Sequence, residues 1–190
     1  AAFQGCFHNP LVSPDMLGVS AGAGFGAALG ILLTNETGAF TAGLSFAMGL
    51  SSVFLSWFLS RIRKDGGTLS LVLAGVIVSA VFNALISFVK LVADTDSQLP
   101  AITFWLMGSL NGTTFRVLAS AVVPIAVGIG LLLAMRWQIN ILTLGDDEAR
   151  SLGINPVRVR MLVIFCATVI TAATVMVAGI IGWVGLIVPN

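Results

Sequence analysis

The sequence predicts an all-α, polytopic membrane protein, and two properties of its composition lead to this fold class. Of its 190 residues, 57% are hydrophobic and only 9% are charged, and the mean hydropathy is +1.05, unlike a soluble domain. Most of the chain also divides into uncharged stretches of about 20 residues, the length of a helix that crosses a hydrocarbon core roughly 30 Å thick. A transmembrane barrel would need alternating strands of about 10 residues, which the sequence does not show.

The first complete membrane helix is expected after a break at His8-Asn9-Pro10, because Asn-Pro stops a helix. Ser13 or Asp15 is expected to cap this helix. It carries one glycine in every four residues, at Gly18, Gly22, Gly26 and Gly30. Such a stripe lets another helix backbone approach closely. Two alternatives remain open: tight helix packing, or a helix that lines a pore or lies beside a gate.

Further spans are predicted at residues 38–60, 70–89, 117–135 and 161–179. The apolar run at 101–110 is too short to cross a bilayer, so we expect a re-entrant type of helix near 101–112 that lines a cavity or is covered by protein. A glycine-punctuated turn at 179–189 leads into another helix. The chain is therefore predicted to be a single transmembrane domain over 1–190 with about six spans. Neither end looks like a natural terminus, which indicates an internal portion of a longer protein.

The most polar stretch of the chain is the segment Trp137–Arg160, called the elbow below. It is expected to form two short helices near 145–158 that meet at a bend. The first turn of the first helix holds three acids, where the helix dipole favours negative charge: Asp146, Asp147 and Glu148. Gly153 is placed to end that helix, and Asn155 and Pro156 are placed to begin the next one as N-cap and first residue.

The positions of Lys and Arg set the expected orientation in the membrane. If the loop at 61–68 and the elbow face the cytoplasm, only Lys90 and Arg116 of the nine basic residues lie on the other side. The cytoplasmic side would then hold the remaining seven: Arg61, Arg63, Lys64, Arg136, Arg150, Arg158 and Arg160. The elbow is therefore predicted to be a cytoplasmic surface feature.

No residue pattern in the chain indicates catalysis or a metal site. His8 is the single histidine, and Cys6 and Cys166 are isolated without metal-ligand spacing. The sequence has no phosphate-binding loop or zinc-protease motif, and the middles of its predicted spans carry no charge that could form an ion relay. If the chain forms part of a transporter, the energy would therefore come from a partner. The elbow, with Leu152 and Ile154 expected to insert into a groove on that partner, is the predicted docking surface.

Five runs of the sequence together resemble a known family. They are FQGCFHNPLVSPDMLGVSAGAGFGAALG, LVLAGVIVSA, FWLMGSLNG, LTLGDDEARSLGINPVRVR and GIIGWVGLIVP. The chain resembles the permeases of type II ABC importers for iron-siderophores, haem and cobalamin, because the five runs occur in the order and spacing of that family. The resemblance covers essentially all of the chain. The resemblance implies part of a ten-helix fold, from the second helix to the start of the eighth.

The same resemblance implies roles for particular residues. Those expected to contact a cytoplasmic ATPase are Gly145, Asp146, Asp147, Ala149, Arg150, Leu152, Gly153 and Ile154. The residues expected at the cytoplasmic gate are Asn9, Pro10, Leu11, Thr68 and Leu69, although the family usually has small polar residues where Leu69 stands. The expected outer mouth includes Trp105, Gly108 and Asn111. Asn190 departs from the histidine that is usual at the end of this stretch.

The resemblance also implies the partners and the cargo. The expected assembly is a homo- or heterodimer of permeases in the bacterial cytoplasmic (inner) membrane, with an ABC ATPase, an extracytoplasmic substrate-binding protein and no nucleic acid. No cofactor is expected in this chain, because ATP and Mg²⁺ would bind the ATPase. The expected cargo is an Fe(III)-siderophore, with haem, cobalamin or an oxyanion such as molybdate as alternatives. A secondary transporter or channel, or a non-transporting fragment, are the competing functions.

Overall fold

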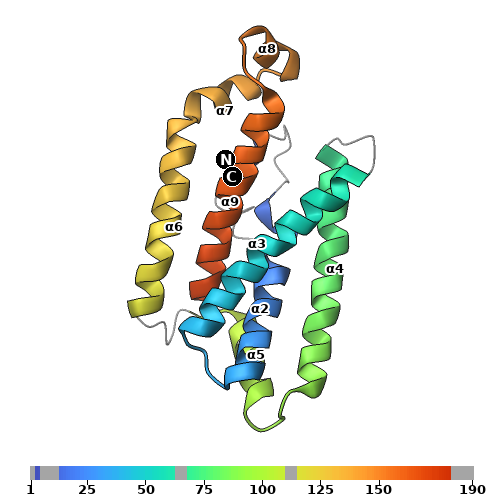
Figure 1. Cartoon of the computed structure of the whole chain (residues 1–190), viewed down its shortest axis with the longest axis vertical. Coiled ribbons are helices and arrows are strands. Elements are labelled where there is room, and N and C mark those ends of the chain that lie inside the picture. The colour runs from blue at the N-terminus through green and yellow to red at the C-terminus, as the bar shows by residue number, and fades with distance from the viewer. Residues whose placement is uncertain (1–2, 5–12, 63–67, 110–114, 181–190) are drawn as a thin grey trace.

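The computed structural model describes residues 3–4, 13–62, 68–109 and 115–180, and the regular elements within them are helices (Figure 1). This confirms the predicted all-α fold class. The elements in chain order are η1 (Pro14–Leu17), α2 (Val19–Thr34), α3 (Ala39–Ile62), α4 (Thr68–Val92), α5 (Gln98–Met107), α6 (Phe115–Ala134), α7 (Arg136–Leu142), α8 (Asp146–Ser151) and α9 (Pro156–Ala178).

Four helices in the described part of the chain are long and apolar enough to cross a membrane: α3, α4, α6 and α9. The helix α2 is apolar but has only 16 residues, so it is shorter than the predicted span. The short helix expected near 101–112 is present as α5, with 10 residues. The remaining expected spans, at the two ends of the chain, lie mostly outside the described residues.

The start of α2 differs from the prediction, because neither Ser13 nor Asp15 caps it. Ser13 instead precedes the short 3₁₀ helix η1, and the N-cap of α2 is Gly18, with a φ of 85°. This left-handed conformation is easily reached only by glycine, and it turns the chain from η1 into α2. The carboxylate of Asp15 accepts a hydrogen bond from the Ser20 hydroxyl and so stays beside the first turn of α2.

The glycine stripe of α2 packs against α3. A Cβ added at Gly22 would lie 2.6 Å from the carbonyl oxygen of Met48, and one added at Gly30 would lie 2.8 Å from the Cα of Thr41. At Gly26 it would meet the backbone of Leu44. Of the two alternatives for the stripe, the structure thus supports tight helix packing, since three of its four glycines face a neighbouring backbone and do not line a pore.

The face of α3 that receives α2 is made of small residues. Thr41, Ser45, Ser52 and Ser56 are buried there. The hydroxyl of Ser56 donates to the carbonyl oxygen of Leu17 at 2.9 Å, which ties the end of η1 to α3. Small side chains on both helices let the backbones approach closely, as is common in membrane helix pairs. The close approach places α2 at the centre of the bundle.

The two ends of the bundle differ in charge, as predicted. Figure 1 shows α7 and α8 at the same end as the last turn of α3 and the first turn of α4, with α5 at the opposite end. Arg61, Arg136 and Arg158 therefore lie toward the elbow end, whereas Lys90, near the end of α4, lies at the other. This is the distribution that the positive-inside rule requires if the elbow end is cytoplasmic.

Side chains connect the turns at the end opposite the elbow. Asp94 accepts hydrogen bonds from the Ser97 hydroxyl at 2.7 Å and from the Ser97 backbone N–H at 3.1 Å. These bonds, the hydroxyl first, hold the pKa of the exposed Asp94 carboxyl below its usual range. The amide of Gln98 donates to Asn35 Oδ1 at 2.6 Å. The α4–α5 turn is thus fastened to the α2–α3 connection.

Candidate functional site

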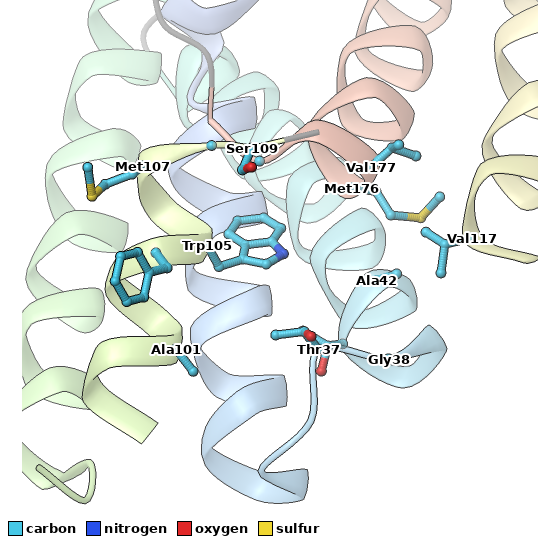
Figure 2. Close-up of a pocket in the computed structure, with 14 residues that line it drawn as sticks. Thr37, Gly38, Ala42, Ala101, Trp105, Met107, Ser109, Val117, Met176 and Val177 are labelled. Carbon is cyan, nitrogen blue, oxygen red and sulfur yellow. The ribbon is translucent and has the colours of Figure 1, made fainter. Parts of the chain in front are cut away.

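A pocket of about 400 Å³ lies at the end of the bundle opposite the elbow and is called the outer pocket below (Figure 2). It is lined by the last turn of α5, including Trp105 and Met107, by the end of α9 with Met176, and by Thr41 and Ala42 of α3. Figure 2 shows the Trp105 indole beside this space, between Ala101 and Ser109. The structure therefore brings together two of the residues predicted at the outer mouth, Trp105 and Gly108. The third, Asn111, lies outside the described residues.

Hydroxyl and aromatic groups line the outer pocket, and no charged side chain is found among its described lining residues. Such a surface suits the passage of an amphipathic molecule rather than tight ionic binding. In the described ranges, no three His, Cys, Asp or Glu side chains come close enough to hold a metal ion.

The residues predicted at the gate are described only in part. Asn9, Pro10 and Leu11 lie outside the described residues, so their placement stays a prediction. Thr68 begins α4, and Leu69 is 72% exposed. Both lie at the elbow end of α4, which is compatible with a gate at that end (Figure 1).

At the elbow, α8 has the predicted polarity. Its N-cap is Gly145, with a φ of 134°, and its first turn carries Asp146, Asp147 and Glu148. Ala149 is fully buried. The acids therefore lie where the helix dipole is positive, while the side of α8 that carries Ala149 faces the core.

Local hydrogen bonds define the turn between α8 and α9. Gly153 has a φ of 78°, its N–H donates to the Arg150 carbonyl at 3.0 Å, and the N–H of Ile154 donates to the Ala149 carbonyl at 2.9 Å. This pair of bonds is the Schellman arrangement that ends helices at a glycine. The prediction that Gly153 ends the first elbow helix is confirmed.

The start of α9 is also as predicted. Asn155 is its N-cap, and its side-chain oxygen accepts hydrogen bonds from the N–H groups of Val157 at 3.1 Å and Arg158 at 3.3 Å. Pro156 occupies the first helical position, where its missing N–H costs nothing.

Replacing Asn155 with alanine should destabilise the elbow by about 1 kcal/mol, the typical cost of losing an N-cap side chain. The Asn155→Asp variant should keep most of the stability, because a carboxylate accepts the same two bonds. Thermal unfolding of the detergent-solubilised full-length protein measures the difference. Asn140→Ala, at an exposed asparagine of α7 that caps no helix, is the matched control. Equal stability of the Asn155→Ala and Asn140→Ala variants would contradict the capping role.

Two features of the elbow differ from the prediction. The second short helix is not separate: α9 begins at Pro156 and continues without a break to Ala178, because no glycine or proline follows within it to stop it. A further short helix, α7, precedes α8. It was not predicted, because the short helices of the elbow were expected only near 145–158.

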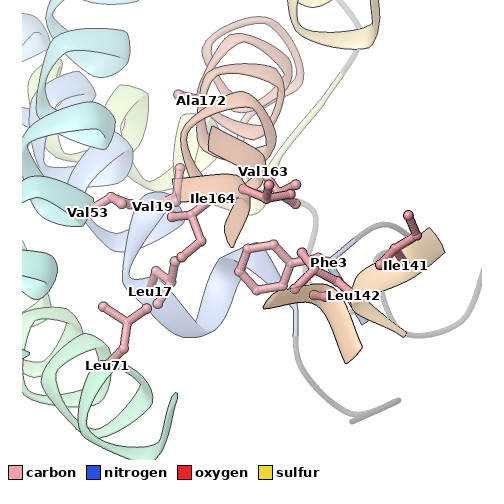
Figure 3. Close-up of a cluster of buried hydrophobic side chains, with 12 residues drawn as sticks. Phe3, Leu17, Val19, Val53, Leu71, Ile141, Leu142, Val163, Ile164 and Ala172 are labelled. Atoms are coloured by element: carbon pink, nitrogen blue, oxygen red, sulfur yellow. The ribbon is translucent and has the colours of Figure 1, made fainter. Parts of the chain in front are cut away.

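The elbow is anchored on the largest cluster of buried side chains (Figure 3). Leu142 of α7, Ala149 of α8 and Val163 of α9 are all fully buried in it. Figure 3 shows Leu142 and Val163 together with Phe3 and with labelled side chains from η1, α3 and α4. An external force on the elbow would therefore act on the packed core of the bundle and would not be absorbed by a loose loop.

An ion pair joins the two helices of the bend. Arg160 Nη2 lies 3.0 Å from Asp146 Oδ1, which connects the second turn of α9 to the first turn of α8. Arg150 and Asp147 form a second pair at 3.5 Å, but both side chains are well exposed, so it contributes little to stability. Asp147 and Arg150 remain accessible to a partner, whereas Asp146 is used within the elbow.

The apolar residues of the elbow tip divide into buried and exposed ones. Leu152 is 55% exposed, but Ile154 is half-buried and packs against the core cluster. Insertion into a partner therefore stays a prediction for Leu152, whereas the packing of Ile154 against the core leaves less of that side chain for a partner. Leu144, 67% exposed at the α7–α8 turn, was missed, although an apolar residue just before the glycine and the acidic turn could have indicated it. A hollow of about 460 Å³ beside Gly153 and Val157 adjoins the tip.

Comparison with known proteins identifies one family whose model matches the whole chain. The FecCD transport family matches residues 1–190. The chain is 40% identical over 98% of its length to the molybdate import system permease protein of Haemophilus influenzae, and covers 55% of that protein. It is 37% identical over 98% of its length to a probable iron chelatin transport system permease protein of Helicobacter pylori, and covers 56% of it. The chain thus spans about half the length of these curated relatives.

A solved structure resembles the fold. It is a chain assigned to a metal-chelate type ABC transporter in an inward-facing conformation, with a TM-score of 0.85 and 37% sequence identity. The similarity covers 99% of this chain and 59% of that one.

Proposed function

This chain belongs to the FecCD transport family, and we propose that it forms the elbow-bearing part of the permease subunit of an ATP-driven importer. The observation that carries the proposal is the elbow itself. It is a rigid, core-anchored projection at the basic end of the bundle, with Leu152 exposed at its tip. A structure of this kind suits the transmission of force from a partner.

In the proposed mechanism the permease hydrolyses nothing. A separate cytoplasmic ATPase, which holds ATP and Mg²⁺, docks on the elbow, and a substrate-binding protein docks at the opposite end. Two permease subunits lie side by side in the cytoplasmic membrane, with the pathway between them. Closure of the ATPase and release of the binding protein shift the dimer between states open to one side or the other.

The cargo that we place first is an Fe(III)-siderophore. The resemblance to iron-siderophore permeases and the similarity to the Helicobacter iron chelatin permease support it. Molybdate is the second candidate, because the relative named for molybdate import shares 40% identity with this chain. The uncharged lining of the outer pocket suits both a bulky chelate and a passing anion that is not held tightly.

The experiment uses the full-length permease, expressed with its cognate ATPase and purified in detergent. The ATPase should remain bound to the permease, and proteoliposomes that contain the complex should take up cargo only in the presence of ATP and the binding protein. A permease that moves cargo without any bound ATPase would overturn the proposal in favour of a secondary carrier or channel. A complex that binds ATPase but moves no cargo would point to a non-transporting role.

The cargo is decided in the same proteoliposomes. Uptake of a labelled Fe(III)-siderophore, haem, cobalamin and molybdate is compared at equal concentrations with the cognate binding protein. Uptake of the siderophore alone supports the first candidate, and uptake of molybdate alone replaces it with the second.

A further inference from the structure

Two glycines outside the elbow make an unusually close contact between distant parts of the chain. Gly108, directly after α5, has a φ of 75°, and Gly179, directly after α9, has a φ of 72°. A Cβ added at Gly179 would lie 2.7 Å from the Cα of Gly108 and 2.6 Å from the Trp105 carbonyl oxygen. A Cβ added at Gly108 would lie 2.9 Å from the Ile180 carbonyl oxygen. Both positions therefore require glycine for two independent reasons, conformation and space.

A backbone hydrogen bond closes this contact. The N–H of Ser109 donates to the carbonyl oxygen of Ala178 at 2.9 Å. The contact formed by Gly108, Ser109, Ala178 and Gly179 is called the glycine clasp below. It fixes the C-terminal end of α5 to the C-terminal end of α9, and the last turns of both helices line the outer pocket.

The other end of α9 is the elbow. The helix has 23 residues, about 35 Å at 1.5 Å per residue. After Pro156 in its first turn, it contains no further proline and no glycine. Its first two turns are held by the Asn155 cap and by the Arg160–Asp146 ion pair. A capped helix without an internal break transmits displacement along its axis with little loss.

The other helix that joins the two ends is less suited to this task. The helix α6 contains Pro124 in its interior, and Met135 separates it from α7. An internal proline removes a helix hydrogen bond and favours a kink. Among the described helices that end at the elbow, α9 is thus the stiffer connection to the outer pocket.

We propose that α9 and the C-terminal end of α5 move as one unit through the glycine clasp, so that displacement of the elbow reaches the outer pocket. The proposal rests on the function proposed above, in which an ATPase displaces the elbow. Gly108 and Gly179 are then positioning residues for transport. Trp105, one turn before the clasp, lines the outer pocket and would move together with the clasp.

The first test substitutes the clasp glycines in the full-length permease, assembled with its ATPase in proteoliposomes. Gly179→Ala and Gly108→Ala should lower the melting temperature, because the added Cβ meets backbone atoms. The fraction of each variant that folds and binds the ATPase should still hydrolyse ATP near the unmodified rate. Cargo uptake per ATP hydrolysed should fall by about tenfold, within the range that coupling positions show. Gly43→Ala and Gly130→Ala, at helix glycines where an added Cβ meets nothing within 4 Å, are the matched controls and should keep the ratio unchanged.

The second test restores the clasp covalently. Cysteines placed at Ser109 and Ala178, in a background without native cysteines, are joined by oxidation or by a short bis-thiol reagent. The joined permease should still transport, because the two positions do not separate during the cycle. When Gly179→Ala is added, joining the two cysteines should recover at least part of the lost coupling.

Three results would overturn the proposal. Loss of transport on cross-linking that reverses on reduction would show that the two helix ends separate. A parallel fall in assembly, ATP hydrolysis and uptake in the glycine variants would show that the clasp is needed for folding and has no separate role in coupling. Unchanged uptake per ATP would remove its role altogether. Each of these is measured against an unmodified permease that transports, whereas failure of the unmodified permease would overturn the proposed function instead.

Discussion

A Leu152→Glu permease should fold and insert normally and yet lose most of its affinity for the ATPase. Leu152 is 55% exposed at the tip of the elbow and supports no core cluster, so its replacement costs the isolated permease little. If the side chain is buried on docking, its loss removes roughly 1.5–3 kcal/mol of hydrophobic stabilisation, which is on the order of 10- to 150-fold in affinity. The added carboxylate would increase the effect, because it would be desolvated in the partner's groove.

The measurement is the dissociation constant of the purified full-length permease and its ATPase, together with ATP-dependent uptake. Leu152→Met is the matched control, since it conserves volume and hydrophobicity, and its affinity should stay within a few-fold of the unmodified value. Leu144→Glu tests whether the second exposed leucine belongs to the same surface. An unchanged dissociation constant for Leu152→Glu, with normal uptake, would mean that the tip is not the docking surface.

Leu152 is a better position for this experiment than the neighbouring glycine. Gly153 has a φ of 78° and forms the helix-ending turn. Any side chain there would strain the backbone, although an added Cβ meets nothing within 4 Å. A charged residue at Gly153 would thus disturb the geometry of the elbow and its surface together, and the two causes could not be separated.

The second large effect concerns the contact between α2 and α3. Gly26→Ala should destabilise the permease by about 1–3 kcal/mol, the usual cost of overpacking a close contact. The added methyl would meet the backbone of Leu44 and lie 2.9 Å from the Cβ of Met48. Backbone atoms in the middle of a helix cannot move aside as a flexible side chain can. The melting temperature of the full-length protein in detergent, and the amount that elutes as a single species, measure the loss.

The control variant for this prediction should not lose stability. Gly43→Ala changes a glycine of α3 where an added Cβ meets nothing within 4 Å. There the substitution should be neutral or stabilising by up to about 1 kcal/mol, because alanine favours a helix more than glycine does. Equal stability of Gly26→Ala and Gly43→Ala would contradict the packing of the glycine stripe against α3.

Much of the elbow could be predicted from the sequence because its geometry is local. The N-cap at Asn155 and the helix end at Gly153 depend on hydrogen bonds between residues no more than five apart. The proline at the first position of α9 fits because its own φ is fixed and no N–H is needed there. The acids in the first turn of α8 also act locally, on the dipole of their own helix. The membrane character, the polarity of the two ends and the short helix α5 also followed from composition and charge, which do not require knowledge of the packing.

The continuity of α9 was missed for a related reason. The sequence indicates where a helix starts, but the end of the second elbow helix was placed at a change from polar to apolar residues. That change marks where the helix enters the apolar core. The backbone hydrogen bonds of α9 continue across this boundary, so the helix does not end there. The burial of Ile154 was missed as well, since the side chain packs against a cluster that includes Phe3 and Leu17, far away in the chain.

The sequence by itself therefore determined the fold class, the four long apolar helices of the described residues, the difference in charge between the two ends and much of the local form of the elbow. Only the tertiary structure decided which surface the glycine stripe meets, which leucines stay exposed at the tip, and that Gly108 and Gly179 join the ends of α5 and α9. The physical reason is the range of the interactions. Caps, dipoles and hydropathy act within a few residues or along one helix, whereas close packing depends on the simultaneous position of segments that are more than 70 residues apart in the case of the clasp.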